Sequence, residues 1–137
     1  MIRAVVDPSV LVSAFIGRPD AGPGRLVAAW RDQRFVVVVS PSLLEELAVV
    51  LARPKFERWA AEGRAAAYVA GFAARSDHRP DPEVVEPSVR DPADDYLVAL
   101  ARAEQVAAIV SLDRDLLDAR LGDVPVEDPA SFVARLG

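Results

Sequence analysis

Acidic side chains that could share a site stand in four separate segments of the chain, three of them beside a predicted strand end or helix start. Asp7 and Asp113 each follow an apolar run, Glu46 lies in a helical pattern, and three acids fall within residues 91–95. Two carboxylates about 4 Å apart repel each other by about 4 kcal/mol at an effective dielectric constant near 20. A group of them needs protons or a cation, and Mg²⁺ and Mn²⁺ are cations that prefer oxygen ligands. The sequence therefore predicts a metal site if the four segments meet.

The elements that must bring these acids together alternate between strands and helices. Apolar runs predict strands at Ile2–Val6, Phe35–Val39, Val106–Ser111 and Val124–Val126, with a further short strand at Val84–Val85. Helical spacing predicts helices at Pro8–Ile16, Arg25–Gln33, 40–52, Asp91–Glu104, Arg114–Ala119 and Pro129–Leu136, with one or two more, broken near Gly63 and Gly71, within Lys55–Ser76. Such alternation is typical of parallel sheets with right-handed crossovers. We therefore predict an α/β protein, a three-layer α/β/α sandwich around a central, mostly parallel sheet of four to five strands, in a single domain over residues 1–137.

This topology would bring the acids to one edge of the sheet. Asp7 and Asp113 directly follow strands, and ligands bind at the carboxyl ends of strands in open α/β sheets. On their shared helix, Glu45 falls opposite the apolar arc, whereas Glu46 falls on its border. The helix after Asp95 is apolar nearly all round and so should be buried, which would carry its acidic first turn to the same edge.

Helix capping is the ordinary alternative explanation for these acids. Asp-Pro is a common helix opening, and besides Asp7-Pro8 it occurs at Asp81, Asp91 and Asp128. An acid such as Asp94 in a first helical turn suits the helix dipole, and Asp115 could cap the helix that follows it. Ser42 and Glu45 have the spacing of a capping box. Convergence of the four segments is what would distinguish a site from a set of caps.

The composition restricts the classes of function. A chain of 137 residues with 52% hydrophobic and 27% charged residues is globular. It has no Cys and one His, His78, which excludes a thiol nucleophile and argues against a structural zinc site. A net charge of -5 argues against a general nucleic-acid binder but not against a nucleic-acid enzyme whose acids hold metal. No apolar run approaches the ~20 residues that span a bilayer, and no signal-peptide layout occurs, so we expect a cytoplasmic protein.

Four motifs occur in a specific order and spacing over essentially the whole chain. They are Val5-Val6-Asp7-Pro8-Ser9, Ser40-Pro41-Ser42-Leu43-Leu44-Glu45-Glu46-Leu47, Asp91-Pro92-Ala93-Asp94-Asp95 and Val110-Ser111-Leu112-Asp113-Arg114-Asp115. Together they resemble the PIN-domain family, the metal-dependent ribonuclease fold of many VapC-type toxins. The stretch Arg53-Pro54-Lys55-Phe56 resembles one subgroup of toxin-antitoxin PIN proteins.

The resemblance implies which residues form the site. Its acidic quartet, which would hold Mg²⁺ or Mn²⁺ and carry the catalysis, corresponds to Asp7, Glu46, Asp95 and Asp113. Asp95 is preferred to Asp94 because its spacing to Asp113 matches the family better. Ser9 and Ser111 stand where the family often has Asn and Thr, and their hydroxyls would orient ligands or contact phosphate. Further candidates beside the site or for phosphate contact are Asp94, Asp115, Arg53 and Lys55, with Arg18, Arg25 and Arg58 as other cations.

The resemblance also implies a function and partners. The chain would hydrolyse RNA phosphodiester bonds as the toxin of a toxin-antitoxin pair, be restrained by an antitoxin in its acidic groove, and form a homodimer through helices, with no membrane role. The alternative is a non-catalytic PIN-fold module that binds RNA or protein. A phospho-accepting receiver domain fits less well because no Lys follows Lys55, and a haloacid-dehalogenase-type phosphatase would have Asp in place of Ser9.

Overall fold

A five-stranded parallel sheet forms the centre of the computed structural model, which describes residues 1–137. Its strands are β1 (Arg3–Val6), β2 (Val36–Val39), β3 (Asp77–His78), β4 (Ala108–Val110) and β5 (Val126–Glu127), in the spatial order β3-β2-β1-β4-β5. All neighbouring strands are parallel, and Ala4 of β1 pairs with Val37 on one side and Ala108 on the other. Strands covered on both faces have no polar side to show, which explains their unbroken apolar sequences.

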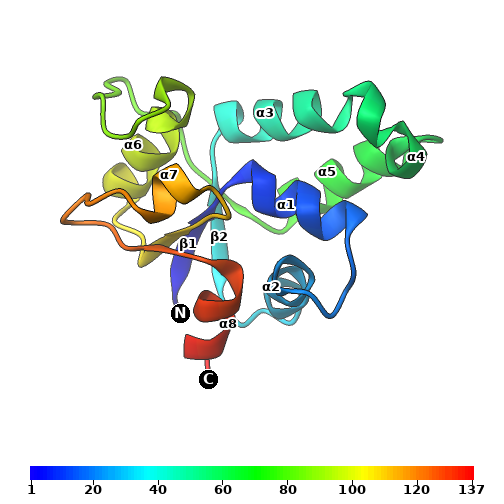
Figure 1. Ribbon diagram of the computed structural model, residues 1–137, viewed down its shortest axis with the longest axis horizontal. Coiled ribbons are helices and arrows are strands. Elements are labelled where there is room, and N and C mark those ends of the chain that lie inside the picture. Colours follow the sequence, from blue (N-terminus) through cyan, green and yellow to red (C-terminus); the bar gives the residue numbers. More distant parts are fainter.

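Helices cover both faces of this sheet. They are α1 (Pro8–Ile16), α2 (Gly22–Arg31), α3 (Pro41–Leu51), α4 (Glu57–Ala60), α5 (Arg64–Ala74), α6 (Asp95–Glu104), α7 (Arg114–Leu117) and α8 (Pro129–Arg135), with short 3-10 helices η1 (Pro54–Phe56) and η2 (Pro92–Asp94). In Figure 1, α6 and α7 lie on one side of the sheet, and α1, α2, α3, α5 and α8 lie on the other. The chain passes from β1 to β3 in one direction and returns to β4 and β5 in the other, so right-handed crossovers place the two sets on opposite faces. The predicted three-layer α/β/α sandwich is confirmed.

The apolar core lies between the sheet and its helices. Val5 and Ile109 in the central strands are completely buried, as are Leu47 of α3 and Leu97 of α6. Burying a side chain of this size contributes about 1.5–3 kcal/mol. The core therefore fixes α3, which carries Glu46, and α6, which follows η2 and begins at Asp95, against the strands that precede Asp7 and Asp113. None of the helices combines the length and the apolar character that crossing a membrane would need.

The last strand on the β2 side differs from the prediction. No strand forms at Val84–Val85, where the two side chains are 72% and 45% exposed. The strand is instead Asp77–His78, which pairs with Val38 and Val39 of β2. It is two residues long and polar because it lies at the edge of the sheet, with β2 as its one neighbouring strand, and neither of its residues is buried.

Several helix boundaries also differ from the prediction. Ser40, and not Ser42, caps α3 by accepting a hydrogen bond from the backbone N–H of Leu43. Ser42 instead donates its backbone N–H and its hydroxyl to Asp81. The predicted break at Gly63 is confirmed, with a left-handed φ of 78°, whereas α5 continues through Gly71.

Candidate active site

Asp7 is the most buried acid at the carboxyl edge of the sheet. It follows β1 directly, is 6% exposed, and caps α1 by accepting a hydrogen bond from the backbone N–H of Ser9 at 3.1 Å. Its other oxygen accepts a hydrogen bond of 2.8 Å from the hydroxyl of Ser111. Asp7 is therefore a helix cap in form, but it is also bonded to a residue 104 positions away. A cap alone requires no such partner.

Ser111 joins Asp7 to Asp113. Its side chain has no exposed surface, and its hydroxyl donates to Asp7 while accepting the backbone N–H of Asp113 at 2.9 Å. Asp113 in turn caps α7 by accepting the backbone N–H of Asp115 at 2.9 Å. The cap of this helix is thus Asp113 and not Asp115. One buried hydroxyl fixes the ends of β1 and β4 relative to each other.

Asp94 lies among these carboxylates. It is the last residue of η2 and is half-buried. Burial, together with the negative charges of Asp7, Asp91 and Asp113 and contact with the Asp113 carboxyl, raises the pKa of Asp94 to about 7. A carboxyl whose pKa is raised by neighbouring carboxylates is one that stands close to them. The structure therefore brings Asp94, Asp7 and Asp113 together.

The neighbouring Asp95 has a different environment. It is 7% exposed, and one carboxylate oxygen accepts the backbone N–H groups of Ser88 and Val89, at 2.9 and 3.0 Å. Asp95 thus holds the segment before η2 against the start of α6. These contacts favour Asp94 over Asp95 as the third acid of the group, whereas the spacing of the sequence favours Asp95.

Glu46 is linked to the other acids through Tyr96, a residue that the sequence motifs do not single out. The hydroxyl of Tyr96, in the first turn of α6, donates a hydrogen bond to the Glu46 carboxylate. Burial raises the pKa of Tyr96 well above its ordinary value, and the hydrogen bond to Glu46 and the charges of Glu46, Asp7 and Asp94 add to this shift. Tyr96 therefore lies between Glu46 and the other acids. The sequence signal for Tyr96 is a hydroxyl directly after two acids, although the residue also fits the apolar pattern of the helix.

The remaining candidates lie around or away from the acids. The Ser9 side chain is exposed, and this residue contributes its backbone N–H to Asp7. Asp115 forms an ion pair with Arg90 at 3.7 Å. Arg53 and Lys55 are exposed beyond the C-terminal end of α3, and no ion pair or hydrogen bond joins either of them to the acids.

The donor set suits Mg²⁺ or Mn²⁺ in kind, because it consists of carboxylates without Cys or His. Burial is the main cause of the raised pKa of Asp94, and the charges of Asp7, Asp91 and Asp113 add to it; a cation among these carboxylates would relieve that part of the shift. No group of three or more His, Cys, Asp or Glu side chains is already arranged so that it could hold a metal ion. Binding would therefore require Asp94, Asp7 and Asp113 to turn toward a shared ion.

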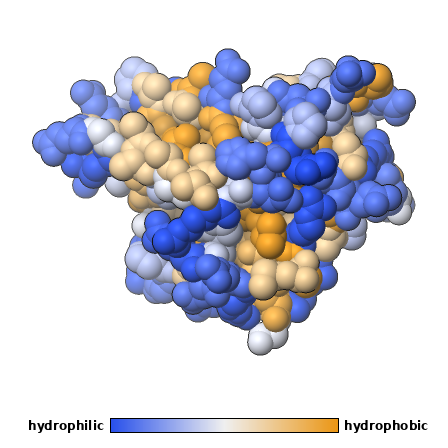
Figure 2. All heavy atoms as spheres, turned by 180° about the vertical axis from the view of Figure 1, so that it is seen from behind, coloured by the Kyte–Doolittle hydropathy of each residue, from blue (hydrophilic) through white to orange (hydrophobic).

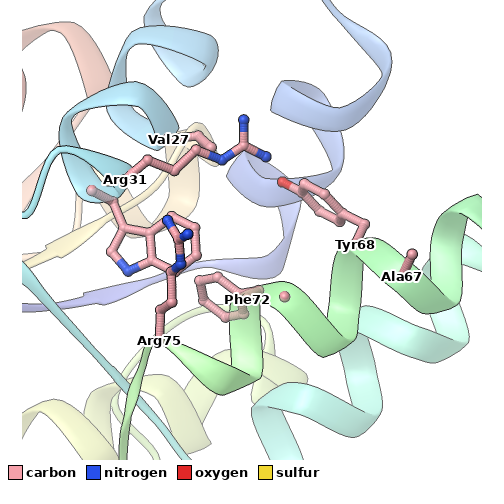
Figure 3. Close-up of a pocket in the computed structure, with 8 residues that line it drawn as sticks. Val27, Arg31, Ala67, Tyr68, Phe72 and Arg75 are labelled. Atoms are coloured by element: carbon pink, nitrogen blue, oxygen red, sulfur yellow. The ribbon is translucent and has the colours of Figure 1, made fainter.

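A separate hollow lies between α2 and α5, away from the acids. It has a volume of about 250 Å³, and its lining includes Val27, Arg31, Tyr68 and Phe72. Figure 3 shows Arg31 of α2 extending toward Tyr68 of α5 across this hollow. The Tyr68 hydroxyl donates to the carbonyl of Leu11 at 2.7 Å, and burial raises the pKa of Tyr68 to about 12. This hydroxyl therefore holds α5 against α1.

Comparison with known proteins identifies the class of domain that this sheet and its acidic edge define. The PIN-domain family matches residues 3–115, and the chain belongs to that family. Its members are generally nucleases, which supports a hydrolase that acts on nucleic acids. An uncharacterized protein of Methanocaldococcus jannaschii, MJ1680, is 27% identical over 125 residues, which cover 87% of this chain and 76% of that protein.

Solved structures show the same fold. VapBC2 from Rickettsia felis, bound to a DNA fragment from its promoter, matches with a TM-score of 0.62 at 14% identity over 93% of this chain and 98% of that one. PAE2754 from Pyrobaculum aerophilum matches with a TM-score of 0.63 at 19% identity, over 98% and 89% of the two chains. FitAcB from Neisseria gonorrhoeae matches with a TM-score of 0.54 at 21% identity, over 92% and 97%.

Proposed function

We propose that the chain is a metal-dependent endoribonuclease and the toxin of a toxin-antitoxin pair, and that it acts in the cytoplasm. The observation that carries the proposal is the closeness of Asp94 to Asp7 and Asp113, together with the buried Ser111 hydroxyl, which binds the Asp7 carboxylate and the backbone N–H of Asp113. Carboxylates held this close repel one another, and a bound cation would relieve the repulsion, whereas helix capping does not require the acids to be close. Membership in the PIN-domain family supports the nuclease class.

In this mechanism Asp7, Asp94 and Asp113 would hold Mg²⁺ or Mn²⁺, with Glu46 at its side. The bound cation supplies water activation and charge neutralisation for phosphodiester hydrolysis. Ser111 orients the Asp7 carboxylate through its hydroxyl, and Tyr96 orients Glu46 in the same way. No side-chain nucleophile is required, which agrees with the absence of Cys.

The partners that we propose are an RNA substrate, a cognate antitoxin and a second copy of the chain. The antitoxin is supported by structural likeness to the VapBC2 and FitAcB proteins. An antitoxin that enters the acidic edge would have to present a cation or a hydrogen-bond donor to Asp7 and Asp94. A neighbouring reading frame that encodes a small antitoxin-like protein is expected.

Replacement of Asp7 by Asn tests the proposal. Cleavage of a mixed-sequence RNA in the presence of Mn²⁺ should fall by more than about 100-fold, because loss of a direct ligand should exceed the ~10–100-fold effect of losing an outer partner. Asp128→Asn is the matched control, since Asp128 also begins an Asp-Pro helix but lies outside the acidic group. Cleavage by Asp7→Asn at the wild-type rate would overturn the assignment.

A non-catalytic PIN-fold module that binds RNA or protein is the second candidate. It is favoured by the lack of any ready-made group of three metal ligands. Calorimetric titration of the purified chain with Mn²⁺ distinguishes the nuclease from the binding module. The nuclease proposal expects one or more saturable sites that disappear in Asp7→Asn, whereas the binding module expects none.

A further inference from the structure

A polar hollow lies between α7 and the segment that precedes η2. It has a volume of about 510 Å³, which is within the range of about 300–1,000 Å³ that small-ligand sites occupy. Its charged lining residues are Arg90 on one wall and Asp115, Asp118 and Arg120 on the other. Figure 2 shows from behind that the half of the molecule that carries α6 has a mainly hydrophilic surface. We call this cavity the α7 hollow, and its lining predicts a polar ligand.

Two side chains of α6 hold the walls of the α7 hollow in place. Asp95 accepts the backbone N–H groups of Ser88 and Val89. Arg102 donates to the Ser88 hydroxyl at 3.1 Å and forms an ion pair of 2.9 Å with Asp123, which follows α7 in the chain. Both walls are therefore fixed to one helix. A site that is already ordered loses less entropy when it binds a ligand.

The α7 hollow adjoins the proposed active site. On one wall, Arg90 directly precedes Asp91, the N-cap of η2, and η2 ends at Asp94. On the other wall, the backbone N–H of Asp115 donates to the Asp113 carboxylate at 2.9 Å. The side chains of Arg90 and Asp115 are 3.7 Å apart, so the two walls meet at this end. An RNA chain with one phosphodiester bound at the acids would therefore have its next nucleotide at the hollow.

The charges of the hollow favour a ligand that offers both hydrogen-bond donors and acceptors. The Asp118 side chain is 66% exposed, and its ion pair with Arg114 is long, at 3.8 Å. Arg120 is exposed and forms no ion pair within the chain. A bare phosphate would be repelled by the two carboxylates, and a metal ion by the two guanidinium groups. A nucleobase has no net charge and carries both kinds of polar group.

Guanine matches this lining better than the other bases. It has two adjacent N–H donors, at N1 and N2, which one carboxylate can accept together. It also has two adjacent acceptors, O6 and N7, which one guanidinium group can bind together. Asp118 and Arg120 are two residues apart at the end of α7, so they can bind neighbouring edges of a single base.

We propose that the α7 hollow binds an unpaired guanine of the RNA substrate, next to the phosphodiester at the acids. The Asp118 carboxylate accepts hydrogen bonds from N1 and N2 of the base, and Arg120 donates to O6 and N7. Arg90, at the end near the acids, contacts the phosphate of this nucleotide. Sequence-specific recognition of RNA generally uses unpaired bases in this way. This inference rests on the proposed function, because it takes RNA as the substrate of the same site.

Binding of single-stranded RNA in EDTA measures the base preference without cleavage. Fluorescence anisotropy compares uridine oligonucleotides that contain one guanine, one inosine or one 7-deazaguanine. The wild-type chain should bind guanine about fivefold or more tightly than either analogue, because inosine lacks the N2 donor and 7-deazaguanine lacks the N7 acceptor. Asp118→Asn should lose the discrimination against inosine, and Arg120→Gln should lose the discrimination against 7-deazaguanine.

Arg90→Gln should behave differently from these two variants. It should weaken binding of all three oligonucleotides alike, because a phosphate contact carries no base information. It should also reduce the slope of log affinity against log salt by about 0.7, the value for one phosphate contact on a single strand. Asp32→Asn and Arg34→Gln, at exposed positions outside the hollow, are matched controls and should leave affinity and preference unchanged. Circular dichroism verifies that each variant is folded.

Cleavage of mixed-sequence RNA in Mn²⁺ provides the second measurement. Mapped cleavage sites should have guanosine at one fixed position beside the cut, and Asp118→Asn and Arg120→Gln should lose this preference. Equal affinities of the wild-type chain for guanine, inosine and 7-deazaguanine would overturn the guanine site, even where Asp7→Asn abolishes cleavage as the proposed function expects. Discrimination in EDTA by a chain that cleaves no RNA would overturn the nuclease and leave the guanine site in place.

Discussion

The hydroxyl of Tyr96 donates a hydrogen bond to the carboxylate of Glu46, which lies 50 residues earlier in the chain. This contact joins α3 to α6 across the carboxyl edge of the sheet. It is also the only hydrogen bond that the Glu46 side chain makes to another side chain. The orientation of the Glu46 carboxylate therefore depends on Tyr96.

Tyr96→Phe should reduce the affinity for Mn²⁺ by about tenfold, the lower end of the effect of losing a partner that orients a ligand. It should lower the free energy of unfolding by about 1.5–3 kcal/mol, the usual contribution of a hydrogen bond to a charged group. Calorimetric titration with Mn²⁺ and urea unfolding measure the two quantities. Tyr68→Phe is the control, because it removes another half-buried tyrosine hydroxyl that does not touch the acids. Equal Mn²⁺ affinities in Tyr96→Phe and the wild type would contradict the positioning role.

Asp94 and Asp95 should respond differently to the same substitution. Asp94→Asn removes a carboxylate that repels Asp7 and Asp113, so stability without metal should be unchanged or higher while Mn²⁺ affinity falls. Asp95→Asn weakens two charge-assisted hydrogen bonds to Ser88 and Val89, which should cost about 1–2 kcal/mol.

Urea unfolding in EDTA and Mn²⁺ titration of the two variants provide the comparison. The reverse pattern, in which Asp95→Asn loses metal and keeps stability, would support the assignment made from the sequence spacing. The two substitutions are matched because each replaces a carboxylate by an amide, at adjacent positions.

The sequence was informative where burial leaves a periodic signal. The β-branched run before Ser40 and the apolar α6 predicted a parallel sheet because strands and helices covered by other layers cannot be polar. The same reasoning placed Asp7 and Asp113 at one edge. It did not find β3, because Asp77 and His78 lie at the edge of the sheet and carry no apolar pattern.

The choice between Asp94 and Asp95 shows what periodicity could not supply. The sequence predicts one helix over residues 91–104, whereas the first turn is the 3-10 helix η2 and α6 begins at Asp95. A 3-10 turn rotates each residue by about 120° instead of 100°, so a change of helix type alters the direction of side chains at the junction. Which adjacent acid faces the site therefore depends on a backbone detail that composition does not encode.

Asp128 allows helix capping to be measured apart from metal binding. Hydrogen bonds from the backbone and side chain of Ser131 hold the pKa of Asp128 below its ordinary value of 3.8. A folded-state pKa below the unfolded one means that the carboxylate stabilises the fold above about pH 4 and that this contribution is lost as the pH falls through the folded value. Asp128→Ala should cost about 1 kcal/mol at pH 7.

This cost should shrink toward pH 3, and Mn²⁺ binding should not change. Urea unfolding of wild type and Asp128→Ala at pH 7 and pH 3 tests the expectation. A difference between the two proteins that grows as the pH falls would contradict the capping role.

Ser111 is where stability and the proposed chemistry are most closely linked. Its buried hydroxyl donates to Asp7 and accepts the backbone N–H of Asp113, so Ser111→Ala leaves two polar groups without this partner. An unsatisfied buried polar group costs about 1–3 kcal/mol, and loss of an orienting partner typically weakens metal binding by about 10–100-fold.

Ser111→Thr keeps the hydroxyl and should retain the Mn²⁺ affinity, although its extra methyl group enters a site with no exposed surface. Because both substitutions disturb packing, Mn²⁺ affinity compared at equal folded fraction is the decisive measurement. If Ser111→Ala bound Mn²⁺ as tightly as Ser111→Thr, the hydroxyl would serve only to join the two strands, and the orientation of Asp7 would have to come from its cap on α1.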